Sequence, residues 1–131
     1  MTSPDRLWAT VYLDAQIDRD ELFRVLTQAT KGRLQRPTLV LGDSLKIHVG
    51  RNDDFDEVRR LDPHDGFFHF RYTLDVDPQG ETSNEDFKGA VGALLEGLWR
   101  EGYWTATACQ FGEELPRGGT WRGEEGAKSD K

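Results

Sequence analysis

Cysteine is nearly absent from this sequence, and no apolar run approaches the length of a membrane span. The single cysteine, Cys109, excludes an intrachain disulfide framework. Its position in an apolar strand pattern predicts a small core side chain rather than a nucleophile. A spanning helix needs about 20 apolar residues, and the amino-terminal residues contain no apolar stretch typical of a secretion signal. We therefore expect a cytoplasmic protein without a membrane partner.

The fingerprints of common catalytic and cofactor sites are also missing. No nucleophile elbow, phosphate-binding loop or dinucleotide fingerprint occurs in the chain. Asn52, Asp54 and Asp56 alternate as calcium ligands do. An EF-hand loop, however, requires glycine and glutamate at the positions that Glu57 and Pro63 occupy here. We expect no cofactor and no metal site, and the sequence favours a non-enzymatic protein while leaving an enzyme open.

The chain contains fewer positively charged residues than negatively charged ones. Asp and Glu number 24 against 17 Lys and Arg, which gives a net charge of −7. The segment 52–65 alone holds six acids and two arginines. Such a surface repels nucleic acid and anionic lipid and favours basic protein partners. We therefore expect no nucleic-acid partner.

The apolar periodicity indicates the same structural unit twice. Each half predicts a strand, a capped helix and a second strand. The predicted elements are a strand at Leu7–Ala15, a helix from Asp18, a strand at Thr38–Leu41, a strand at Phe67–Asp77, a helix from Ser83 and a strand at Trp104–Phe111. With an added hairpin over 38–49, this order predicts an α+β fold, a two-layer sandwich with the ferredoxin-like split β-α-β layout. We expect one domain over residues 1–111 and a mobile carboxy-terminal tail over 112–131, in which Trp121 either docks or is exposed.

This layout places both helices on one face of the sheet and leaves the other face open. If the alternating apolar residues face the helices, large aromatic and basic side chains remain on the open face. These are Trp8, Thr10, Tyr12, Phe67, His69, Arg71 and Thr73, with Lys46 and His48 from the hairpin. Such a surface indicates an interface or a ligand site; the alternative is that the tail covers it. The sequence does not decide which face of Trp104–Phe111 points inward.

Two short stretches of the predicted strands resemble the RNA-recognition motif. Gly66–Tyr72 (GFFHFRY) follows the glycine-aromatic alternation of that family, and Val11–Leu13 (VYL) is similar to its first-strand motif. The resemblance implies base stacking on this sheet face. Asp65 replaces a basic residue of the motif, and His69 replaces a stacking aromatic. More generally, with 12 Arg to 5 Lys, the chain resembles small uncharacterised bacterial proteins with a ferredoxin-like layout.

The leading hypothesis is a non-enzymatic protein-binding module, for example an immunity-type or regulatory inhibitor. It would use the open face and the acidic segment to bind a basic protein or a second copy of itself. The candidate binding residues are Trp8, Tyr12, His48, Phe67, His69, Arg71, Asp53, Asp54, Asp56 and Glu57. The alternative is a small dimeric enzyme or small-ligand-binding protein whose pocket lies between two open faces. In that case His48, His69 and Arg71 would line a site for a small anion.

Overall fold

Two α-helices and six antiparallel strands make up the computed structural model, which describes residues 7–36, 39–42, 44–62 and 66–121. The elements in chain order are β1 (Ala9–Asp14), α1 (Arg19–Thr30), β2 (Arg33–Arg36), β3 (Leu39–Leu41), β4 (Leu45–Arg51), the 3₁₀ turns η1 (Arg59–Leu61) and η2 (Gly66–His69), β5 (Tyr72–Pro78), α2 (Asn84–Arg100), β6 (Trp104–Cys109) and the 3₁₀ turns η3 (Gly112–Glu114) and η4 (Pro116–Gly119). The predicted α+β sandwich is confirmed.

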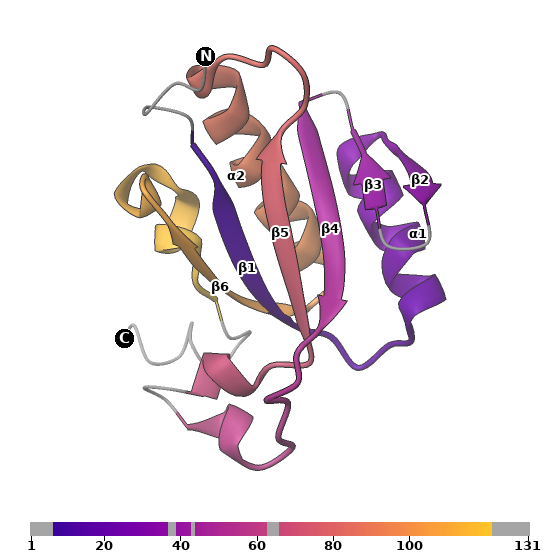
Figure 1. The fold of residues 1–131 in the computed structure, drawn as a ribbon. Coiled ribbons are helices and arrows are strands. Elements are labelled where there is room, and N and C mark those ends of the chain that lie inside the picture. The colour runs from indigo at the N-terminus through magenta and orange to yellow at the C-terminus, as the bar shows by residue number, and fades with distance from the viewer. Residues whose placement is uncertain (1–6, 37–38, 43, 63–65, 122–131) are drawn as a thin grey trace.

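The strand order is β2-β3-β4-β5-β1-β6, so β1 and β5 lie side by side in the sheet, as predicted (Figure 1). The predicted hairpin over 38–49 appears as the β3–β4 pair, but its role differs from the prediction. Strand β4 pairs with β5 over seven residues and is a main strand of the sheet. The added piece is therefore the β2–β3 pair at the sheet edge. The finer assignment to the ferredoxin-like class stays a prediction.

Both helices pack on the same face of the sheet (Figure 1). Alternation in β1, β4 and β5 directs every second side chain to that face, which forms the core. The largest fully buried side chains include Leu13, Leu22, Leu26, Ile47, Phe70, Leu74, Phe87, Leu94, Leu95 and Leu98. In β6, Thr105 and Thr107 lie opposite the core residues Leu13 and Val11 of β1. This register answers the question left open by the sequence, because Thr105, Thr107 and Cys109 form the helix-facing set.

The helices begin where the sequence predicts. The Asp18 carboxylate accepts the backbone N–H of Glu21 at 2.9 Å, and the Ser83 hydroxyl accepts that of Asp86 at 3.1 Å. Each satisfies a backbone donor that the first helical turn leaves unpaired. At the end of α1, Lys31 adopts the left-handed conformation at the carboxy-terminal cap.

Two glycines of α2 are in opposite environments. A Cβ at Gly97 would lie 3.1 Å from the Cβ of Ala29 in α1, whereas a Cβ at Gly89 would meet nothing within 4 Å. Gly97 thus allows close contact between α2 and α1, and Gly89 has no such role. We expect Gly89→Ala to raise the free energy of unfolding by about 1 kcal/mol, because alanine is the better helix former. Gly97→Ala is the matched variant, and urea unfolding should show no gain from it.

Residues 112–121 differ from the predicted mobile tail. Trp121 forms a β-bridge with Thr105, with N···O distances of 2.9 and 3.0 Å, and its ring lies 6.2 Å from that of Trp99 in α2. Leu115 is buried in the core. This segment therefore packs on β6 and α2 rather than over the open face. Residues 122–131 lie outside the described residues.

Candidate binding surface

The open face of the sheet carries both small and large side chains in its middle rows. The register places four residues side by side across β4, β5, β1 and β6 in each row. One row is Gly50, Thr73, Tyr12 and Ala106, and the next is His48, Asp75, Thr10 and Ala108. Thr10 donates to the Asp75 carboxylate at 3.3 Å. No helix of the described residues covers these rows (Figure 1).

Trp8 lies beyond one end of these rows, directly before β1. Its side chain is 45% exposed, and its backbone N–H donates to the side-chain oxygen of Gln110 at 3.1 Å. This hydrogen bond fixes the backbone of Trp8 at the sheet, while its indole ring remains partly exposed to solvent. Trp8 is where the sequence predicted it.

Three aromatic rings gather at the other end. The Tyr12 ring lies 5.3 Å from Phe67 and 5.9 Å from Phe68 in edge-on contacts, and the two phenylalanine rings are 4.1 Å apart. Phe68 is 47% exposed. We call Tyr12, Phe67 and Phe68 the aromatic cluster. Phe68, which the sequence placed with the core face, is its most exposed member.

The predicted strand over 67–77 is wrong in its first part. Gly66–His69 forms the turn η2, and β5 starts only at Tyr72. The physical reason is Asn52, whose side-chain amide donates to the carbonyls of Phe68 and Phe70 at 2.7 and 2.8 Å. The amide satisfies two acceptors that a neighbouring strand would otherwise pair. The aromatic alternation that resembles the RNA-recognition motif therefore lies partly on a turn.

His69 and Arg71 were predicted to lie on the open sheet face, but their side chains contact the acidic segment instead. The His69 ring Nδ1 lies 2.8 Å from the Asp54 carbonyl. The Arg71 guanidinium lies 4.4 Å from the centre of the Phe55 ring and 4.0 Å from the Glu57 carboxylate. The structure thus does not bring His48, His69 and Arg71 together into one site.

The acidic segment has both structural and exposed members. The Asp56 carboxylate accepts the backbone N–H groups of Val58 and Arg59, both at 2.9 Å, and these bonds lower the pKa of its carboxyl. Asp56 is therefore a cap of the local turn. Asp53 and Asp54 are exposed, and the side chain of Glu57 is 62% exposed. Asp53 and Asp54 remain available to a partner, whereas the Glu57 carboxylate also lies within 4.0 Å of the guanidinium groups of Arg60 and Arg71.

A buried ion pair anchors the segment to the sheet, and the sequence did not predict it. The guanidinium of Arg60 contacts the Asp14 carboxylate, with side-chain exposures of 12% and 4%. The same guanidinium lies 5.7 Å from the centre of the Trp104 ring. An aspartate at the end of an apolar strand was the one available signal, but nothing in the sequence identified its partner.

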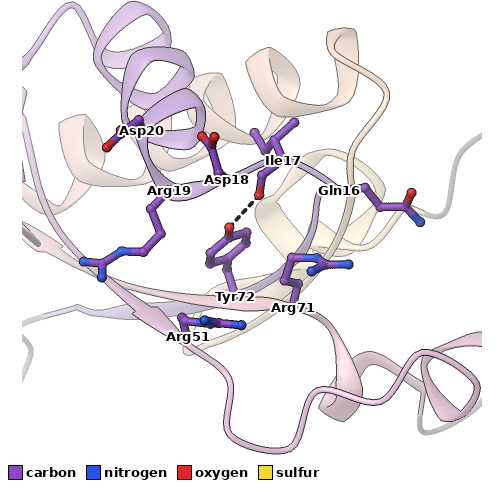
Figure 2. A pocket seen from close by; sticks show the side chains of 8 residues that line it. All are labelled: Gln16, Ile17, Asp18, Arg19, Asp20, Arg51, Arg71 and Tyr72. Carbon is purple, nitrogen blue, oxygen red and sulfur yellow. Dashed lines mark hydrogen bonds between the residues drawn. The ribbon is translucent and has the colours of Figure 1, made fainter.

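A hollow of about 600 Å³ lies at the start of α1. Its lining includes Arg19, Arg51 and Arg71 together with Ile17 and Tyr72, and the Tyr72 hydroxyl donates to the Ile17 carbonyl at 2.6 Å (Figure 2). Of the three arginines, only Arg71 was a candidate in the sequence. Arg51 lies at the end of β4 and Arg19 at the start of α1. Neither residue belongs to a sequence motif that would mark it as a binding residue.

Partial burial raises the pKa of the Cys109 thiol, which disfavours the reactive thiolate. Within the described ranges, no group of His, Cys, Asp or Glu side chains is placed to hold a metal ion. No described helix is both long enough and apolar enough to cross a membrane. Neither a protein-family model nor a curated protein nor a solved structure matches this chain.

Proposed function

We propose that this protein is a non-enzymatic protein-binding module that acts through the open sheet face, in the cytoplasm. The observation that carries the proposal is the pair of half-exposed aromatic side chains Trp8, directly before β1, and Phe68, which contacts Tyr12 of β1. Neither α1 nor α2 covers this face of the sheet (Figure 1). Aromatic side chains at protein interfaces account for a large share of the binding energy when a partner desolvates them.

The rows between these aromatics support a protein partner. Gly50, Thr73 and Ala108 project little from the sheet, so a partner backbone or flat surface can approach closely at these positions. Small residues beside the larger Tyr12 and His48 give the face an uneven surface that a protein partner can match. The Tyr12 ring packs edge-on against Phe67 within the aromatic cluster. This contact fixes the orientation of the two rings before a partner binds, which lowers the entropy cost of association.

Charge favours a basic partner. Asp53, Asp54 and Glu57 are exposed in the acidic segment, which directly precedes the turn η2 with Phe68, and the whole chain has a net charge of −7. Exposed carboxylates accelerate the encounter with a positively charged surface and make it dependent on ionic strength. An immunity-type or regulatory inhibitor of a basic protein is the concrete form of this proposal.

The double variant Trp8→Ala/Phe68→Ala tests the proposal. With the partner purified from the host of this protein, we expect the variant to bind about 100-fold more weakly in a calorimetric titration, because two aromatic anchors are lost. Trp8 is 45% and Phe68 47% exposed, so the variant should still fold, with a lower thermal midpoint because the contact of Phe68 with Phe67 is lost.

Leu34→Ala is the matched control, because Leu34 is 47% exposed, like Phe68, but lies on the edge strand β2. Equal binding by the double variant and the wild type would contradict the proposal. If the wild type forms only a homodimer that the double variant loses, the alternative function applies, with a pocket between two open faces.

A further inference from the structure

We propose that the hollow at the start of α1 binds a small polyanionic ligand that carries phosphate or carboxylate groups. Three arginines are among its lining residues, Arg19, Arg51 and Arg71. Arginine presents a planar set of donors that fits both anion types with two parallel hydrogen bonds. This site is separate from the open sheet face and does not depend on the proposed protein partner.

The arginines of the hollow are poorly neutralised by the protein itself. Within the described part of the chain, Arg19 and Arg51 form no ion pair, and Arg71 reaches a carboxylate only at 4.0 Å, in Glu57. The Nε atom of Arg71 is buried and has no hydrogen-bond acceptor among the described residues. A buried donor without an acceptor is destabilising, and an anionic ligand would remove that cost.

The two acids in the lining, Asp18 and Asp20, offset part of this charge, and the three arginines leave the lining with one net positive charge. In Figure 2 the carboxylates of Asp18 and Asp20 lie on the helix side of the Tyr72 ring, whereas the arginines extend along the sheet side. The sheet side of the hollow is therefore the positive side, and the ligand's anionic groups belong there.

The scaffold holds these arginines apart and in place. Arg51 ends β4 and pairs with Tyr72 of β5, Arg71 directly precedes β5, and Arg19 begins α1. Three donors from three elements suit a ligand with more than one anionic group rather than a single monovalent ion. The volume of about 600 Å³ is in the range of small-molecule sites. Ile17 and the ring of Tyr72 offer apolar contact to the ligand's carbon skeleton.

Calorimetric titration of the full chain at constant ionic strength tests this inference, with inorganic pyrophosphate and citrate as the two probes. We expect one saturable site for at least one probe, and the tighter probe assigns the ligand class as phosphate or carboxylate. The double variant Arg19→Gln/Arg51→Gln should bind that probe about 100-fold more weakly, because each guanidinium forms charge-assisted bonds. Both side chains are on exposed residues, so the variant should fold.

The control variant Arg33→Gln/Arg59→Gln removes the same charge from exposed residues that do not line the hollow. It should bind the probe as the wild type does. Two results would overturn the inference: no saturable binding of either probe, or equal weakening in the control variant, which would indicate a general effect of net charge.

Discussion

Replacing Asp14 by alanine is expected to lower the free energy of unfolding by about 3–5 kcal/mol, the usual cost of removing one partner from a buried ion pair. The side chain of Arg60 is 12% exposed, so without the Asp14 carboxylate its charge would remain in the interior, and the Glu57 carboxylate 3.6 Å away is itself 62% exposed. The contact of Arg60 with the Trp104 ring offsets little of this cost, because a cation–π contact is worth about 0.5–2 kcal/mol. Urea unfolding monitored by tryptophan fluorescence measures the change.

Two further variants separate the buried pair from charge effects at the surface. Glu57→Ala removes a carboxylate that is 62% exposed and 3.6 Å from Arg60, and it should cost at most about 1 kcal/mol. The double variant Asp14→Leu/Arg60→Met replaces both charges with apolar side chains and should recover most of the stability lost in Asp14→Ala. An Asp14→Ala protein as stable as the wild type would contradict the buried-pair assignment.

Gly66→Ala is expected to destabilise the protein by about 1–3 kcal/mol, as overpacking of a close contact does. A Cβ at this position would overlap the backbone of Arg60, lying 2.8 Å from its carbonyl carbon. Because backbone atoms cannot rotate away, η1 and η2 must separate. The separation should also loosen the aromatic cluster, since Phe67 and Phe68 belong to η2.

Near-ultraviolet circular dichroism reports on the aromatic cluster, and amide hydrogen exchange reports on η2. We expect both signals to change in Gly66→Ala. Gly112→Ala is the matched variant, because a Cβ there would meet nothing within 4 Å, and it should leave both signals unchanged. Unaltered dichroism and exchange in Gly66→Ala would contradict the described packing of η1 against η2.

The helices were predictable because several local signals agree. Around Ser83, a capping residue precedes an apolar repeat at helical spacing, and α2 begins at Asn84. Around Asp18 the same combination precedes α1. The apolar alternation of β1 likewise fixed its inward face, with Val11 and Leu13 fully buried. In these elements the local pattern and the tertiary contacts favour the same structure.

The parts that differ from prediction depend on contacts distant in sequence. The aromatic alternation over 67–71 is typical of a strand, but the Asn52 amide bonds the carbonyls of Phe68 and Phe70 and stabilises a turn instead. Strand β2 has no apolar alternation to reveal it, because its residues are Arg-Leu-Gln-Arg.

The candidate binding residues divide in the same way. Trp8, Tyr12 and His48 lie on or beside β1 and β4, whose alternation the sequence showed. His69 and Arg71 follow the turn and were misplaced. The exposure of Phe68 and the arginine hollow arise only when separate elements assemble, so no local pattern could indicate them.

Native mass spectrometry of this protein, captured from its own host, tests the central proposal most directly. The protein-binding proposal predicts that the wild-type chain forms a complex with one basic partner protein. The Leu34→Ala chain should form the same complex. The Trp8→Ala/Phe68→Ala chain should appear as a free monomer. The same heteromeric mass for that double variant, or a free monomer for the wild type, would contradict the proposal that the open sheet face binds a protein.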